Sequence, residues 1–152
     1  MTVILGPAQK NMSVAYPGSA GDVVANRFEM TIPAGTPTTD IIELGSIPPN
    51  CRVLDAILDV GGSLGTTAVV EVGVMSGPPG AQNNADNVTP RTSGSEFFAA
   101  AAGTASAVTR MTAVTGFRVA PTPAERGIGL KFSTRTVGTA ALVALTVFMA
   151  TT

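Results

Sequence analysis

The stretch that decides the fold is Asp40-Ile-Ile-Glu-Leu-Gly-Ser-Ile-Pro-Pro-Asn-Cys-Arg-Val-Leu-Asp-Ala-Ile-Leu-Asp-Val60. It predicts two strands joined by a rigid corner, because Gly45 and the run Pro48-Pro49-Asn50 do not continue a β-ladder. Alternation places Ile42 and Leu44 on one side of the first strand. Four apolar residues share a side of the second strand: Leu54, Ala56, Leu58 and Val60. A chain that turns such a corner passes from one sheet to another, as in a β-sandwich.

The composition of the whole chain also favours short strands and turns. The 152 residues include 17 glycines and 11 prolines, and 45% of the residues are apolar. This length predicts one domain with a substantial core, and the composition suits strands better than a helical bundle. We therefore expect an all-β protein with an extended N-terminal arm at residues 1–22 and a single β-sandwich domain at residues 23–152.

Apolar alternation locates further elements. Besides the two strands of the deciding stretch, it predicts strands at 23–32, 67–75, 107–111, 114–119, 127–133 and 140–151. Residues 76–94 are rich in Pro, Gly, Asn and Ser and predict a long surface loop. One short helix is expected at Ser95–Ala102, because Ser95 can cap it, its alanines favour a helix and Gly103 ends it. The final strand is apolar on both faces, which indicates a central strand or a subunit interface.

Charge and hydropathy exclude two classes of partner. Charged residues make up 12% of the chain, the net charge is −1 and the nine basic residues are scattered. No basic stripe is available for nucleic acid. The longest strongly apolar run, 140–150, is too short to cross a membrane, and Thr2–Leu5 lacks the features of a signal peptide. So few charges indicate either an exterior that meets other proteins or a compact fold with a Thr/Ser/Gly/Asn surface.

The residues that usually carry catalysis are missing. The chain has no histidine and no tryptophan, and Tyr16 is its single tyrosine. Without histidine, the commonest general base and metal ligand is absent, and a Ser–His–Asp arrangement is impossible. Cys51, the single cysteine, supports neither an internal disulfide nor a zinc site and is expected as a buried thiol. The loop residues Asp22, Asp40 and Asp86 lack calcium-loop spacing. We expect no enzyme, no cofactor and no metal site.

Two acidic residues of the second predicted strand share a face with apolar ones. Asp55 and Asp59 are separated by about 13 Å at ~3.3 Å per residue, which is too far for the paired carboxylates of most glycosidases. Val53 and Ile57 are expected on the same face. This apolar–acidic alternation predicts a partly buried contact with another subunit, and a covering loop is the alternative.

Several segments, in their order along the chain, resemble a pattern in small structural proteins of tailed bacteriophages. They are Thr31-Ile-Pro-Ala-Gly-Thr36, Asp40-Ile-Ile-Glu-Leu-Gly-Ser-Ile-Pro48, Arg52-Val-Leu-Asp-Ala-Ile-Leu58, Leu64-Gly65 and Val70-Glu-Val-Gly73. Over about residues 28–150 the sequence is similar to head decoration (cement) proteins and related jelly-roll virion proteins. Each segment is a generic strand-and-turn signal, and only their order is distinctive. The resemblance implies a jelly-roll-like β-sandwich without catalytic residues.

The resemblance also implies partners and a location. A decoration protein, made in the host cytoplasm, would bind the major capsid protein on the outer capsid surface and bridge its subunits through many weak contacts. A homo-oligomer, dimer or trimer, is expected. The expected capsid or subunit contacts are Val3, Ile4, Leu5, Tyr16, Val53 and Ile57. The alternatives are a glycan- or receptor-binding jelly roll of a phage fibre, which scarce aromatics disfavour, and a structural adaptor of the tail or connector.

Overall fold

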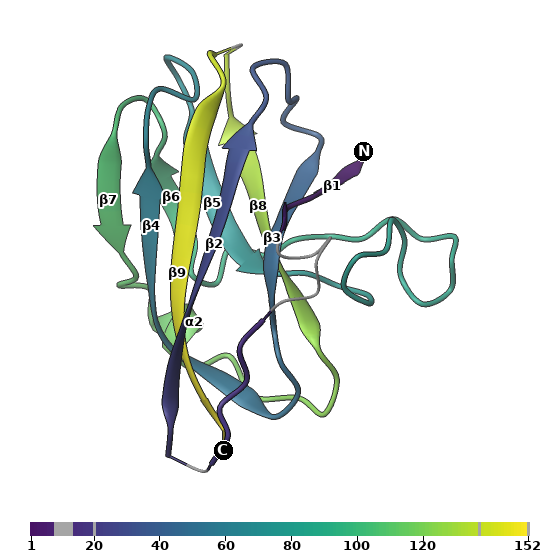
Figure 1. Ribbon diagram of the computed structural model, residues 1–152. Helices are drawn as coiled ribbons and strands as arrows, with labels where there is room; N and C mark the ends of the chain where they lie inside the picture. The colour runs from purple at the N-terminus through teal and green to yellow at the C-terminus, as the bar shows by residue number, and fades with distance from the viewer. Residues whose placement is uncertain (8–13, 20, 137, 152) are drawn as a thin grey trace.

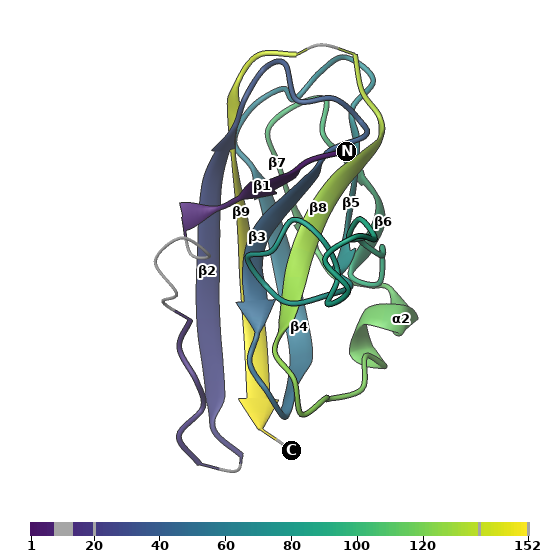
Figure 2. The same ribbon diagram turned by 90° about the vertical axis from the view of Figure 1, so that its right-hand side faces the viewer.

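The computed structural model describes residues 1–7, 14–19, 21–136 and 138–151. Two β-sheets pack face to face as a sandwich (Figures 1 and 2), one with the strand order β1-β3-β8-β5-β6 and the other with the order β2-β9-β4-β7. The elements are β1 (Val3–Leu5), β2 (Val23–Ile32), β3 (Ile41–Ile47), β4 (Cys51–Val60), β5 (Val69–Val74), β6 (Phe98–Ala102), β7 (Ala107–Arg110), α2 (Val114–Phe117), β8 (Arg126–Thr134) and β9 (Ala141–Thr151).

The connectivity is that of a jelly roll. With β1 set aside, β3-β8-β5-β6 face β2-β9-β4-β7, which is the arrangement of two Greek keys in an eight-stranded jelly roll. β3 and β4 lie in different sheets, and the corner between them is a turn in which the amide of Cys51 donates to the carbonyl of Pro48. Asn50 in this corner has a positive φ of 56°. The predicted all-β sandwich and its proline corner are confirmed.

The core lies between the two sheets. Phe28 of β2 packs across it onto β3, where a Cβ at Gly45 would lie 2.5 Å from the Phe28 ring. Gly45 therefore allows the sheets to approach at this point, beside a β-bulge that follows Glu43. Cys51 is fully buried, as expected, and burial raises the pKa of its thiol. β9 lies between β2 and β4. It is therefore a central strand, which is one of the two alternatives that its two apolar faces indicated.

The register of β4 differs from simple alternation. A β-bulge between Val53 and Asp55 inserts one residue, so the side chains on either side of it exchange faces. Val53 is buried in the core at 1% exposure, whereas Leu54 is 40% exposed. Val53 and Ile57 were expected on one face, and that expectation is wrong because the bulge separates them. The inward residues after the bulge are those predicted: Ala56, Leu58 and Val60.

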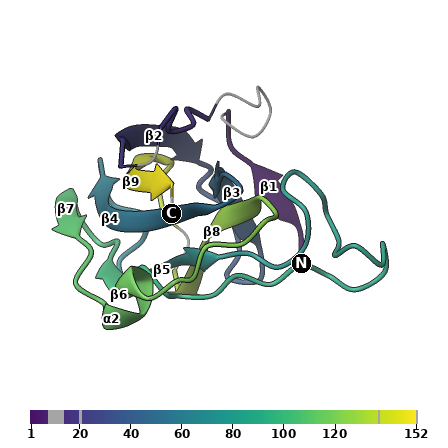
Figure 3. The same cartoon turned by 90° about the horizontal axis from the view of Figure 1, so that it is seen from below.

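The predicted helix at Ser95–Ala102 is also wrong. Its second half is the strand β6, which pairs with β5 through Val69↔Ala102 and Val72↔Phe98. Alanine prefers helices only weakly, and the free edge of β5 together with the burial of two phenylalanines outweighs that preference. The short helix is instead α2, within residues expected as a strand, where buried Gly116 lies against the sulfur of Met111. Figure 3 shows β6, β7 and α2 together at one side of the sandwich.

The described parts of the N-terminal arm lie against the sandwich of their own chain. Val3–Leu5 form β1, which pairs in parallel with β3. Ala15 exchanges two hydrogen bonds with the Asn26 side chain, of 2.8 and 3.0 Å, and so holds residues 14–19 beside the edge strand β2 (Figure 2). Residues 8–13 and 20 of the arm lie outside the described residues. The boundary between arm and domain remains a prediction.

Candidate interaction surfaces

The outer side of the β1-β3-β8-β5-β6 sheet is covered by residues 75–97, and we call it the covered face. Glycines on two neighbouring strands make room for this segment. A Cβ at Gly129 would lie 2.6 Å from the Ser93 hydroxyl, and a Cβ at Gly127 would lie 2.7 Å from the Arg91 guanidinium. Gly73 likewise touches the backbone of Gly94. The segment can lie flat on the sheet because these strand positions carry no side chain.

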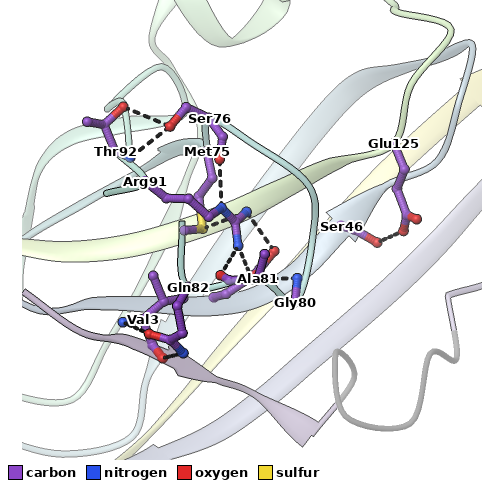
Figure 4. Close-up of polar contacts among 11 residues, drawn as sticks. Val3, Ser46, Met75, Ser76, Gly80, Ala81, Gln82, Arg91, Thr92 and Glu125 are labelled. Atoms are coloured by element: carbon purple, nitrogen blue, oxygen red, sulfur yellow. Dashed lines mark hydrogen bonds and ion pairs between the residues drawn. The ribbon is translucent and has the colours of Figure 1, made fainter. Parts of the chain in front are cut away.

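A buried ion pair anchors the segment to β3 (Figure 4). Arg91 and Glu43 are both fully buried, and their side chains form two bonds of 2.7 and 3.1 Å. The guanidinium also donates to the carbonyls of Ser76 and Ala81, at 2.6 and 2.9 Å. The amide of Gly80 donates to Glu43 at 3.0 Å. Because both charges are paired with each other and hydrogen-bonded to the backbone, the ion pair fixes the covering segment on β3.

Residues 83–90 form a structured tip that projects from the sandwich (Figure 1). Asp86 accepts hydrogen bonds from the Thr89 hydroxyl and from the amides of Val88 and Thr89, the last two at 3.0 and 2.9 Å. These hydrogen bonds lower the pKa of Asp86, and the bond from the Thr89 hydroxyl has the largest effect. The amide of Asn84 donates to the carbonyl of Thr89 at 2.8 Å. The tip therefore holds Val88, which is 79% exposed, in a defined position.

The outer side of the β2-β9-β4-β7 sheet carries charged residues that remain exposed to solvent, and we call it the open face. Arg27 donates to Asp59 at 3.0 Å and to Glu29 at 2.6 Å, and these bonds raise the pKa of Arg27. Arg110 donates to Asp55 at 2.6 Å. Ile57 is half-buried among them. The predicted apolar–acidic alternation of Asp55, Ile57 and Asp59 is therefore present on the open face.

The six residues expected as contacts are not brought into one patch. Val3 is 3% exposed, and its backbone exchanges hydrogen bonds of 3.1 and 2.8 Å with the Gln82 side chain. Ile4 and Leu5 are partly buried on β1, while Tyr16 is 52% exposed beside β2. Val53 is in the core, and Ile57 lies on the open face. Their role as contacts remains a prediction.

A cleft of about 560 Å³ lies beside the covering segment and was not foreseen from the sequence. We call it the Arg126 cleft, and its lining is Met75, Gly77, Pro78, Pro79, Ala85, Thr122, Ala124, Glu125 and Arg126. The Nε atom of Arg126 is buried and has no hydrogen-bond partner among the described residues. Burial lowers the pKa of Arg126, and the negative charge of Glu96 opposes this effect. Proline and glycine pairs predicted a loop here, but no local signal placed that loop near Arg126.

Within the residues that the structure describes, no three His, Cys, Asp or Glu side chains gather as a metal site would require. Of the loop aspartates, Asp40 accepts from the amide of Thr2 at 2.9 Å and Asp86 bonds within its own tip. No helix in the described ranges has the length and apolarity needed to cross a membrane.

Comparison with known proteins finds likeness among solved structures. No protein-family profile and no curated protein matches the sequence. A chain in the structure of the capsid of Ralstonia phage GP4 aligns with a TM-score of 0.87 and 35% identity, covering 99% of this chain and 98% of that chain. A chain in the capsid asymmetric unit of cyanophage Pam1 aligns with a TM-score of 0.57 and 17% identity, covering 92% and 94%. The second likeness shows the fold alone.

Proposed function

This chain belongs to a family of bacteriophage capsid structural proteins that includes a chain of the Ralstonia phage GP4 capsid. Within that family, we propose that it is a non-enzymatic decoration protein. In this role it binds the major capsid protein on the outer surface of the shell and stabilises the shell by bridging capsid subunits. The observation that carries the proposal is the end-to-end match, which covers 99% of this chain and 98% of the capsid chain.

The self-contained core supports addition to a shell that is already assembled. The buried apolar residues form a main cluster that draws on both sheets, from Phe28 and Ile42 to Met149. A jelly roll that closes its core within one chain needs no partner to fold. Such a module can bind to a formed shell as a folded unit, and weak contacts made by several copies then add through avidity.

The contact surface that we propose is the open face around Ile57, together with Ile4, Leu5 and Tyr16. Ile57 is half-buried between Asp55 and Asp59, whose charges Arg110 and Arg27 neutralise. Neutralised charges around an apolar centre reduce the desolvation cost of docking. The other two expected contacts, Val3 and Val53, are buried in their own chain and support β1 and β4. A homo-oligomer, dimer or trimer, would present several such faces.

The test is co-sedimentation of the purified protein with undecorated heads of its own phage, titrated to saturation. We expect saturable binding at a fixed number of copies per shell. Ile57→Asp should weaken head binding about tenfold or more, because it places a charge at the centre of the contact. Val114→Asp is the matched control, since Val114 is 58% exposed on α2 and lies off the open face.

Two results would count against parts of the proposal. A folded wild-type protein that does not bind heads would overturn the decoration role. Association with tail components alone would then favour the adaptor, and a glycan-array signal would favour the receptor-binding jelly roll. Normal head binding by Ile57→Asp would leave the decoration role intact and would reject the open face as the contact.

A further inference from the structure

The Arg126 cleft has the features of a built binding site rather than a surface irregularity. One wall comes from the covering segment, with Pro78 and Pro79 near its start and Ala85 in its tip, and the other comes from Thr122 and Ala124 before β8. Arg126 lies at the first position of β8, where its backbone pairs with Ile47 of β3. Its location is thus set by the sheet, and the surrounding walls are mainly apolar.

The Nε atom of Arg126 lacks a hydrogen-bond partner among the residues that the structure describes. This atom is buried, and Arg126 forms no ion pair within the described ranges. The nearby carboxylates are engaged elsewhere: Glu125 accepts from the Ser46 hydroxyl, and Glu96 accepts from the amide of Val74 at 2.8 Å. A desolvated donor without an acceptor costs free energy, and a ligand that supplies the acceptor would recover it.

We propose that the Arg126 cleft binds a carboxylate carried on a short apolar group. A planar guanidinium presents its donors as a fork that matches the two oxygens of a carboxylate. The proline and alanine walls suit a few methylene groups behind the carboxylate. A dianion such as sulfate is disfavoured, because Glu96 and Glu125 add negative charge to the surroundings.

This site is separate from the proposed capsid contact around Ile57. All the residues of the cleft come from one chain, so binding can be measured on the isolated protein without any phage head. The carboxylate has two possible sources, an acidic side chain or chain end of a neighbouring protein and a free small acid. Both present the same group to Arg126, and the experiment separates them.

The experiment follows the Nε–H signals of the arginines by NMR in ¹⁵N-labelled full-length protein. The signal of Arg126 is assigned by its disappearance in Arg126→Lys. Sodium propionate is titrated against propionamide at matched ionic strength. We expect a saturable shift of the Arg126 signal with propionate and none with propionamide. Absence of a saturable shift, an equal response to propionamide, or tighter binding of sulfate would overturn the proposal.

Variants link the shift to the cleft. Arg126→Gln should lower propionate affinity about tenfold or more, measured through the amide signals of Ala85 and Ala124, because a charge-assisted pair is lost. Ala124→Phe should block binding by filling the cleft while leaving Arg126 in place, since Ala124 is exposed. Arg118→Gln is the control at an exposed arginine and should leave binding unchanged. Unaltered affinity in both Arg126→Gln and Ala124→Phe would reject the site.

The source of the carboxylate is tested with two peptides of matched length. N-acetyl-Ala-Ala-Glu-amide carries a side-chain carboxylate, and N-acetyl-Ala-Ala-Ala with a free C-terminus carries a chain-end carboxylate. Binding of either peptide about tenfold tighter than propionate would indicate a protein partner and the type of carboxylate that it offers. Equal affinity of all three would indicate a free small acid.

Discussion

The two outer faces of the sandwich use the same kind of interaction in opposite settings. On the covered face, Arg91 and Glu43 form an ion pair with no solvent exposure. On the open face, Arg27 pairs with Asp59, and the two side chains are 44% and 33% exposed. A buried pair is costly to break because one charge is left uncompensated, whereas an exposed pair contributes little. The comparison teaches that burial, and not the chemistry of the pair, decides its contribution to stability.

Glycine distribution explains why one face is covered and the other is not. β5 contains Gly73 and β8 contains Gly127 and Gly129, all in contact with the covering segment. No glycine occurs in β2, β4, β7 or β9. A strand without side chains at alternate positions admits a second layer of backbone, and a strand with Arg, Asp and Ile at those positions does not.

The largest effect is expected from breaking the buried pair. Glu43→Gln should lower the free energy of unfolding by about 3–5 kcal/mol, because Arg91 would remain buried with an uncompensated charge. Urea denaturation measures this change. The double variant Glu43→Leu, Arg91→Met removes both charges and should recover most of the loss. A Glu43→Gln protein as stable as the wild type would show that the covering segment is not anchored by this pair.

A smaller loss is expected from filling the space under the segment. Gly127→Ala should cost about 1–3 kcal/mol, since the added methyl group meets the fixed Arg91–Glu43 pair and must displace it. Gly35→Ala is the control, because no atom lies within 4 Å of the position that its Cβ would take. Equal denaturation midpoints for the two variants would contradict the tight approach.

Lowering the pH should loosen residues 83–90, the tip of the covering segment, before it loosens the part of the segment that Arg91 anchors. The hydrogen bonds of Asp86 lower its pKa in the folded state, so their stabilisation is present above the unfolded pKa and is lost as the pH falls through the folded pKa. Amide exchange of Thr89 should therefore quicken over that acidic range, while the amide of Ser76, which donates to the carbonyl of Thr92 at 3.0 Å, stays protected. Asp86→Asn cannot titrate and should show no such pH dependence in Thr89. The same acid response in this variant would assign the effect to another group.

The smallest effect is expected on the open face. Asp59→Asn should leave the urea midpoint unchanged within error, because its partner Arg27 is solvated in either state. Asp55→Asn should be more noticeable, since Asp55 is 14% exposed and also accepts from the amide of Ala56 at 2.8 Å. Equal and large decreases of the urea midpoint in both variants would indicate that the open face is less solvated than the structure shows.

Local sequence patterns predicted much of the fold but failed at two identifiable places. The Ser95–Ala102 prediction depended on helix propensity, which is weak compared with the pairing of β6 to β5. The face prediction for β4 assumed unbroken alternation, and the bulge after Val53 has no sequence marker of its own. Cys51, by contrast, was correctly placed in the core, because a lone cysteine at the start of an apolar strand has few other roles.

The candidate surfaces were predictable only in part. The alternation of Asp55, Ile57 and Asp59 is a period of two within one strand, and the sequence revealed it directly. The Arg126 cleft joins the loop around Pro78 to the start of β8, which are far apart along the chain. No window of neighbouring residues contains both walls, so no local pattern could reveal it.

By itself, the sequence determined that the chain is a β-sandwich with a proline corner between sheets, and that it lacks the histidines on which common catalysis depends. Strand periodicity, turn residues and composition are local properties, and they act before any distant contact forms. Only the tertiary structure decided that Arg91 bonds Glu43 across 48 residues, while the buried Nε of Arg126 finds no hydrogen-bond partner in the described part of the chain. The reason is physical: both arginines have the same intrinsic chemistry, and the packing of distant segments alone fixes which carboxylate each can reach.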